Sequence, residues 1–292
     1  MTDNSTASQD VATQPTDGAK KPPSNLAIRL LTAGIAGPLI LLLLYLGPAW
    51  AWLVFIALAA AIGAFEFFGM VHKGDTVSVA AGVVLSLVVL LTLWFDGTNP
   101  AVLVTLLMLL PIVAIAIALA RLGPMETAAV RLTSSVFGPI YLGAGMAAIA
   151  MLKRDAGSDG PGFVVLTLML SWMSDTGAYF AGRFLGKRKL YEAVSPKKTV
   201  AGAFGGLAAA TAGALAGSFF YLKSLPPLHA VGFGVVAGGL GQMGDLGESL
   251  LKRSVGVKDS GGIVPGHGGI LDRVDALLVT ASLAYVYVLF IR

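Results

Sequence analysis

The region from residue 248 to residue 275 concentrates acidic and basic side chains in a chain that is otherwise strongly apolar. Its ionisable residues are Glu248, Lys252, Arg253, Lys258, Asp259, His267, Asp272, Arg273 and Asp275. Charges this dense beside membrane-length apolar runs are costly unless they do chemistry or line a water-filled cavity. We therefore expect this region to belong to a functional site.

Two carboxylates in and beside this region have the chemistry of a divalent cation site. Asp245 ends one apolar run and Asp272 begins the next, so we expect both at helix ends on the same side of the membrane. Mg²⁺ prefers oxygen ligands and is usually shared between a few carboxylates and substrate phosphates. The chain has no cysteine and no histidine cluster, which argues against zinc. The sequence thus predicts Mg²⁺ bound by Asp245 and Asp272, with a second cation as an option; a loop-ordering salt-bridge network is the alternative.

A third charged motif, SPKKT at 195–199, directly precedes an apolar run at 200–222. Pro196 can open a helix there, with Ser195 as its cap. A helix N-terminus that carries two lysines and two hydroxyls suits an anionic phosphate. The alternative, given equal weight, is a pair of lysines that merely flanks a membrane span.

Two more carboxylates lie inside apolar runs. Asp175 is near the middle of the run at 162–182, and Glu66 is near the end of the run at 50–71. An ionised carboxylate at membrane depth must face a polar cavity, a cation or a hydrogen-bonding partner. Asp175 is therefore either a site residue or a structural one bound to a neighbouring helix. Glu66 lines a cavity or is hydrogen-bonded at the interface.

Composition identifies the elements that must position these residues. The chain has 292 residues, of which 56% are hydrophobic and 12% charged, whereas soluble domains carry about 25% charged residues. We expect an all-α polytopic membrane protein with about nine transmembrane helices. The candidate spans are 28–47, 50–71, 76–95, 100–120, 130–152, 162–182, 200–222, 227–245 and 274–291.

The polar residues 1–25 are expected to form a disordered tail, outside a single catalytic membrane domain at 26–292. With the N-terminus inside, sixteen of the 20 lysines and arginines fall on inner segments, as the positive-inside rule favours. This places the loops at 183–199 and 246–273, and a polar cavity of the C-terminal half, on the cytoplasmic side of the cytoplasmic (inner) membrane. A net charge of +4 is too small to indicate nucleic-acid binding.

The segment 249–275 resembles the signature of the phosphatidate cytidylyltransferases, also called CDP-diacylglycerol synthases. The matching positions are Ser249, Lys252, Arg253, Lys258, Asp259, Pro265, His267, Gly268, Gly269, Asp272, Arg273 and Asp275. Val264 departs from the isoleucine or leucine expected there. The Ser174-Asp175 pair and the SPKKT motif are also similar to family features, so the resemblance covers residues 26–292.

The resemblance implies transfer of CMP from CTP to phosphatidic acid, giving CDP-diacylglycerol and pyrophosphate. A lipid phosphate monoester, with a second pKa of about 6, is already a nucleophile, so the reaction needs charge neutralisation and in-line positioning rather than a strong base. The implied partners are CTP, phosphatidic acid, the lipid bilayer and, as one option, a second copy in a homodimer.

Mapped onto matching positions, the resemblance assigns two groups of residues. The catalytic candidates are Asp245, Asp272, Lys258, His267 and Arg273. The candidates for contacts with the nucleotide and phosphates are Asp175, Ser195, Lys197, Lys198, Thr199, Lys252, Arg253 and Asp259. His267 either orients a phosphate or assists the leaving pyrophosphate, or it is structural within a glycine-rich turn whose backbone amides bind phosphate.

Two other functions compete with this interpretation. A CTP-dependent kinase of a lipid alcohol would attack the γ-phosphorus and release CDP, and it would need a base such as His267. A transporter would show inverted repeats with broken helices in both halves. The nearly uncharged first half argues against the transporter.

Overall fold

The computed structural model describes residues 25–261 and 268–292. The predicted tail, apart from its last residue, and His267 therefore lie outside the described residues. The elements are α1 (Asn25–Leu46), α2 (Ala49–Val71), α3 (Thr76–Asp96), α4 (Pro100–Ala120), η1 (Met125–Thr127), α5 (Ala128–Gly138), the π-helical η2 (Pro139–Ala144), α6 (Gly145–Asp155), η3 (Gly157–Asp159), α7 (Gly160–Leu185), β1 (Lys189–Tyr191), β2 (Ser195–Thr199), α8 (Val200–Phe220), α9 (Pro227–Ser254) and α10 (Leu271–Phe290).

The prediction of an all-α polytopic membrane protein is confirmed. Each of the nine apolar runs coincides with a helix, and the fifth is the continuous stack of α5, η2 and α6. In the described part of the chain, seven helical segments are long and apolar enough to cross a membrane. The remaining two runs correspond to α1 and α9, and the number of spans stays a prediction.

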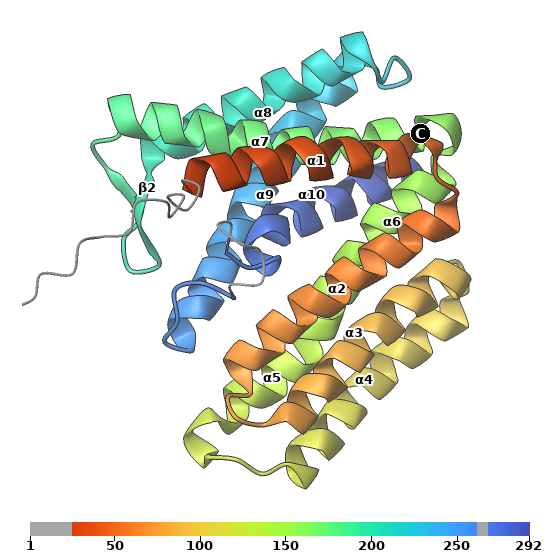
Figure 1. The fold of residues 1–292 in the computed structure, drawn as a ribbon, viewed down its shortest axis with the longest axis vertical. Helices are drawn as coiled ribbons and strands as arrows, with labels where there is room; N and C mark the ends of the chain where they lie inside the picture. Colours follow the sequence, from red (N-terminus) through yellow and green to blue (C-terminus); the bar gives the residue numbers. More distant parts are fainter. Residues whose placement is uncertain (1–24, 262–267) are drawn as a thin grey trace, which may run out of the picture.

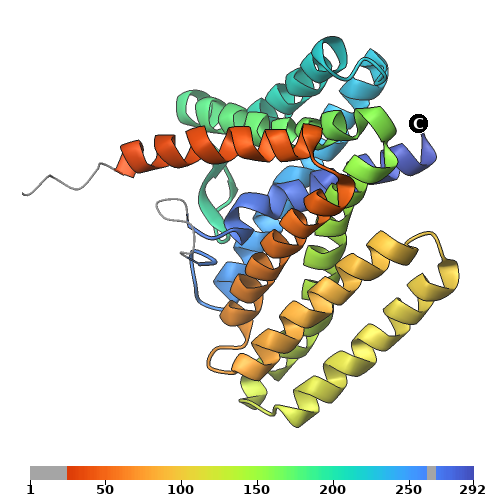
Figure 2. The same ribbon diagram turned by 45° about the vertical axis from the view of Figure 1, so that its right-hand side comes forward.

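The helices form two groups joined by α10. Figure 1 shows α2, α3 and α4 side by side on one flank, whereas α7 and α8 lie together at the other end. Between them, α10 contacts α9 and α7 on one side and α6 and α2 on the other. Figure 2 shows the same division after a 45° turn. The charged C-terminal half therefore rests on the apolar first half.

Segments predicted to share a membrane face contact one another. Lys73, in the loop after α2, donates to the carbonyl of Val255, just beyond α9, at 2.7 Å. At the opposite ends of the helices, Lys153 Nζ caps the end of α1 by donating to Leu43, Leu44 and Gly47 carbonyls at 2.6–2.9 Å. These contacts agree with the predicted alternation of the spans.

The tightest helix pair, α7 with α8, packs through small residues. A Cβ added to Gly177 would lie 2.5 Å from both the Gly205 carbonyl oxygen and the Ala209 Cβ. Close backbone approach of this kind is how helices associate in lipid, where no hydrophobic driving force acts between them. The pair therefore forms a rigid base under the residues that α7 carries.

Gly177→Ala is expected to lower the thermal unfolding midpoint in detergent, because overpacking costs about 1–3 kcal/mol. Gly232→Ala on α9 is the matched control. A Cβ at Gly232 meets no atom within 4 Å, and alanine favours the helix by about 1 kcal/mol over glycine. Equal midpoints for the two variants would contradict the packing argument.

Two local predictions are wrong. Residues 195–199 form strand β2, paired antiparallel with β1, so Pro196 opens no helix and Ser195 caps none. The cap of α8 is instead Thr199, whose Oγ1 accepts the Gly202 N–H at 3.1 Å. Proline is tolerated in β2 because both strands of a two-stranded ribbon are edges.

The second correction concerns Asp245, which lies inside α9 rather than at its end. The helix continues for nine residues beyond it, to Ser254. Glu248 and Lys252, four residues apart, form an ion pair in this extension, and such pairs support a helix. Asp245 is therefore held by rigid backbone on both sides.

Candidate functional site

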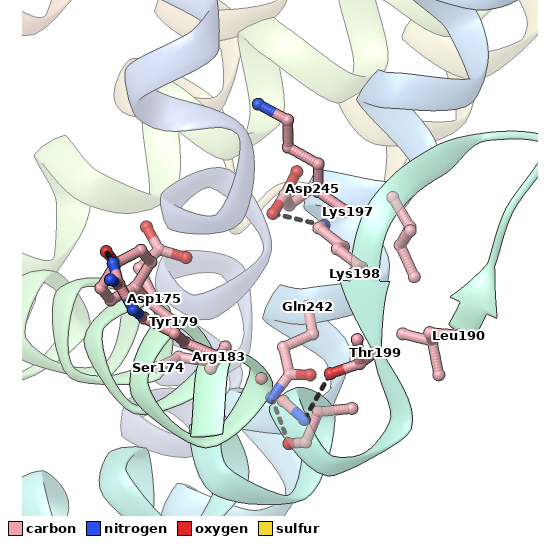
Figure 3. Close-up of a pocket in the computed structure, with 15 residues that line it drawn as sticks. Ser174, Asp175, Tyr179, Arg183, Leu190, Lys197, Lys198, Thr199, Gln242 and Asp245 are labelled. Atoms are coloured by element: carbon pink, nitrogen blue, oxygen red, sulfur yellow. Dashed lines mark hydrogen bonds and ion pairs between the residues drawn. The ribbon is translucent and has the colours of Figure 1, made fainter. Parts of the chain in front are cut away.

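A polar cavity of about 380 Å³ lies where α7, the β1–β2 hairpin, α8 and α9 meet. Figure 3 shows the side chains that line it. Its polar lining consists of Ser174, Asp175, Tyr179, Arg183, Lys197, Lys198, Thr199, Gln242 and Asp245. The cavity thus unites the Asp175 motif, the SPKKT motif and Asp245, which the sequence alone left separate.

The centre of the cavity holds an ion pair between two predicted site residues. Lys198 Nζ, from β2, lies 2.5 Å from Asp245 Oδ2 on α9. Both side chains keep a little over a quarter of their surface exposed, so solutes reach them. The pair places an ammonium group beside a carboxylate in an accessible cavity. The ammonium can bind a phosphate, and the carboxylate can bind a metal ion that accompanies the phosphate.

Carboxylates from three helices lie within electrostatic reach of one another near this pair. They are Asp175 on α7, Asp245 on α9 and Asp275 on α10. The sequence analysis gave Asp275 no site role, although it belongs to the matched signature. Tyr141 of the π-helical segment donates to the Asp275 carbonyl at 3.1 Å, which anchors this part of α10.

The residues around Asp175 and Asp245 fit a hard cation. A second, very small cavity of about 10 Å³ adjoins Ser174, Asp175, Gln242 and Asp245, about the room needed for one water or ion. Ser174 Oγ is buried there, and no described residue forms a hydrogen bond with it. Within the described ranges, no three acidic or histidine side chains are close enough to ligate one ion together. Phosphate oxygens or waters would complete the coordination, as is usual for Mg²⁺.

Asp272 lies outside the cavity lining and belongs to a separate buried cluster. Its Oδ1 accepts from Lys252 Nζ at 2.6 Å. Its Oδ2 accepts from Ser260 Oγ at 2.8 Å and from the N–H groups of Ser260 and Gly269, each at 3.2 Å. All these donors occupy oxygens that a metal would need, so the arrangement matches the salt-bridge alternative. Metal binding by Asp272 stays a prediction.

Lys252 lies between two acids. Its Nζ is 2.6 Å from Glu248 Oε2 as well as from Asp272 Oδ1. None of the described residues gives either Glu248 oxygen a hydrogen bond. The contact between Lys252 and Glu248 is therefore an ion pair without the angles of a hydrogen bond. Burial raises the pKa of Glu248 to about 7, although the adjacent Lys252 opposes that shift. Lys252 is thus central to a buried, charge-dense cluster.

The remaining predicted residues lie around these two centres. Arg253 donates to the Val257 carbonyl at 3.0 Å and to the Val194 carbonyl at 3.4 Å, tying α9 to the hairpin. Lys258 and Asp259 are exposed in the loop after α9. Arg273 lies within electrostatic reach of Asp175, while Ser195 is absent from the cavity lining.

The sequence analysis missed three cavity residues that helical spacing could have indicated. Tyr179 and Arg183 lie four and eight residues after Asp175, which places all three on one face of α7. Arg183 Nη1 donates to the Tyr179 hydroxyl at 2.8 Å. Gln242 lies one turn before Asp245 on α9 and donates to the Ala203 carbonyl at 3.1 Å. Tyr179 and Arg183 line the cavity on the α7 side, across from the lysines, whereas Gln242 lies close to Thr199.

The fold and the cavity define a polytopic helical membrane protein with acidic and basic side chains facing one polar site. The chain matches the Cytidylyltransferase family over residues 27–291 and belongs to that family. This confirms the resemblance found in the sequence.

Similar proteins are named phosphatidate cytidylyltransferase. The one from Staphylococcus aureus (strain COL) is 39% identical over 143 residues, which cover 49% of this chain and 54% of the relative. The one from Staphylococcus haemolyticus (strain JCSC1435) is 42% identical over 126 residues, covering 43% and 48% respectively. The chain thus spans about half the length of the curated relatives it matches.

Proposed function

We propose that this protein transfers CMP from CTP to phosphatidic acid, producing CDP-diacylglycerol and pyrophosphate. The observation that carries the proposal is the cavity lined by Lys197, Lys198, Asp175 and Asp245, in which Lys198 pairs with Asp245. Membership of the Cytidylyltransferase family and the names of the relatives support this choice of reaction.

In the proposed reaction, a phosphate oxygen of phosphatidic acid attacks the α-phosphorus of CTP. A new P–O bond forms while the bond between the α-phosphorus and the bridging oxygen breaks, and pyrophosphate leaves with that oxygen. Lys197, Lys198 and Arg183 neutralise and orient the phosphates, which is the main requirement for phosphoryl-type transfer. Asp175 and Asp245 would hold Mg²⁺, which supplies further neutralisation of phosphate charge.

The proposed setting is the cytoplasmic membrane, with the cavity facing the cytoplasm. Support comes from the excess of lysine and arginine on the segments around the cavity and from the contact between predicted inner segments through Lys73 and Val255. This orientation lets water-soluble CTP meet a lipid that stays in the inner leaflet. A homodimer stays a prediction of the resemblance.

Lys198→Ala is expected to lower kcat/KM for CTP by about 10- to 100-fold, because a hydrogen bond to a charged group contributes about 1.5–3 kcal/mol. Lys187→Ala is the matched control, since Lys187 is exposed just after α7 and does not line the cavity. Steady-state kinetics at varied CTP concentration measure the effect. A similar loss of kcat/KM in both variants would contradict a specific role of Lys198 and attribute the loss to the overall positive charge of the protein surface.

The proposed function is tested with purified protein in detergent, phosphatidic acid, Mg²⁺ and CTP labelled at the α-phosphorus. Label is expected in the lipid together with one pyrophosphate per transfer, and chelation by EDTA should abolish it. Failure of label to enter lipid under conditions that preserve the folded protein would refute the proposal.

A further inference from the structure

Glu66 links the first half of the chain to the charged loop between α9 and α10. It lies on α2 and is only 4% exposed. Its Oε2 accepts the N–H of Leu271 at 2.9 Å and lies 3.4 Å from the hydroxyl of Ser260. One carboxylate from the apolar half therefore contacts both sides of the loop.

Two glycines of the loop lie flat against this carboxylate. A Cβ on Gly261 would lie 2.6 Å from Glu66 Oε1, and a Cβ on Gly269 would lie 2.6 Å from Glu66 Oε2. Real Cβ atoms essentially never come this close to another heavy atom. The described ends of the loop, at Gly261 and Gly269, thus both pack against Glu66. This contact gives a physical reason for glycine at two positions that a salt-bridge network does not explain.

Glu66 also fixes the start of α10. Leu271 is the first residue of that helix, and the preceding Ile270 offers no side-chain cap. The N–H groups of a first helical turn need partners from outside the helix, and Glu66 supplies one for Leu271. The next residue is Asp272, whose Oδ2 accepts from the same Ser260 hydroxyl at 2.8 Å. Glu66 and Asp272 are therefore linked through one shared partner, the Ser260 hydroxyl.

Stability alone does not account for Glu66. Among the ion pairs between described residues, none includes Glu66. None of the described residues gives its buried Oε1 a hydrogen bond. Burying a carboxylate with so few partners is costly. Its contacts instead fix Ser260, in the loop between α9 and α10, and Leu271, the first residue of α10.

We propose that Glu66 is a positioning residue, which holds Ser260 and the start of α10 so that Asp272 keeps its place beside Lys252 and Arg273 stays within electrostatic reach of Asp175. Glu66 acts through these groups and requires no contact with substrate. The kinetic consequence rests on the proposed CMP transfer, whereas the structural consequence does not.

Three substitutions separate the reach of the side chain from its charge. Glu66→Ala removes the acceptor, Glu66→Asp keeps the charge but shortens the side chain, and Glu66→Gln keeps both length and an acceptor oxygen. We expect the alanine and aspartate variants to lose about 10- to 100-fold in kcat, the size of effect seen for partners that orient site residues. Their KM for CTP should stay near that of the unaltered protein. Glu66→Gln should recover most of the kcat.

Hydrogen–deuterium exchange provides a readout without activity. In Glu66→Asp, peptides covering residues 256–275 should exchange faster, while peptides from the hairpin at 189–199 should keep their rate. Glu126→Gln, at an exposed acid in η1 before α5, is the matched control and should change neither.

Unchanged exchange and unchanged kcat in Glu66→Asp would overturn the proposal, as would a Glu66→Gln variant as slow as Glu66→Asp. If Glu66→Ala does not fold, the comparison of Glu66→Asp with Glu66→Gln still tests the proposal. If the unaltered protein transfers no CMP, the proposed function fails, but the exchange measurement still tests the role of Glu66.

Discussion

Replacing Asp245 by asparagine is expected to slow CMP transfer by about 100-fold or more, the scale of losing one preorganised electrostatic group. Asparagine keeps the shape of the side chain but removes the negative charge that lies 2.5 Å from Lys198 Nζ. The proposed Mg²⁺ site loses an anionic ligand, and Lys198 loses its partner. Initial rates with saturating CTP and phosphatidic acid in detergent micelles measure the effect.

Asp75→Asn is the matched control for this substitution. Asp75 also pairs with a basic side chain, Arg121 at 2.9 Å, but it lies outside the cavity. We expect this variant to keep the kcat of the unaltered protein. If both variants lose activity equally, breaking any aspartate–cation pair harms the protein, and the specific role of Asp245 is contradicted.

The second large effect is expected at Lys252, where Lys252→Met should lower the free energy of unfolding by about 3–5 kcal/mol. The substitution keeps an aliphatic chain of similar length but leaves Glu248 and Asp272 buried without their shared cation. Thermal unfolding in detergent measures the change as a lower midpoint. Lys223→Met, at an exposed lysine between α8 and α9, should leave the midpoint unchanged.

The loss at Lys252 should depend on pH. Burial raises the folded-state pKa of Glu248 to about 7, above the ordinary value of a glutamate. A raised carboxyl pKa contributes stability that is present below the unfolded-state value and is lost as pH rises through the folded-state value. Without Lys252, the folded state can bury a neutral Glu248 at little cost, but burying an ionised Glu248 is costly. Lys252→Met should therefore lower the free energy of unfolding less at pH 5 than at pH 8. Equal destabilisation at both pH values would contradict the buried-charge account.

The sequence predicted the helices well because each apolar run is about as long as a membrane-spanning helix. The family signature at 249–275 likewise identified the charged loop without structural help. The SPKKT motif was misassigned because a proline and a serine before an apolar run are compatible with either a helix start or a short strand. Only the pairing with β1 decides between them.

The composition of the site depends on tertiary packing that local patterns do not encode. Asp175 and Asp245 are seventy residues apart, and they meet because α7 and α9 both pack on α8 and on each other. The sequence analysis paired Asp245 with Asp272, whereas the structure surrounds Asp272 with Lys252, Ser260 and Gly269. Glu66 could not be joined to the loop at 260–271 from sequence, since the contact spans about two hundred residues.

The most direct test of the central claim follows two labels of CTP in parallel, one at the α-phosphorus and one at the γ-phosphorus. With phosphatidic acid and Mg²⁺, the α-label should enter the lipid and the γ-label should appear only in pyrophosphate. Entry of the γ-label into a lipid, with CDP released, would contradict cytidylyl transfer and assign the protein to CTP-dependent lipid phosphorylation.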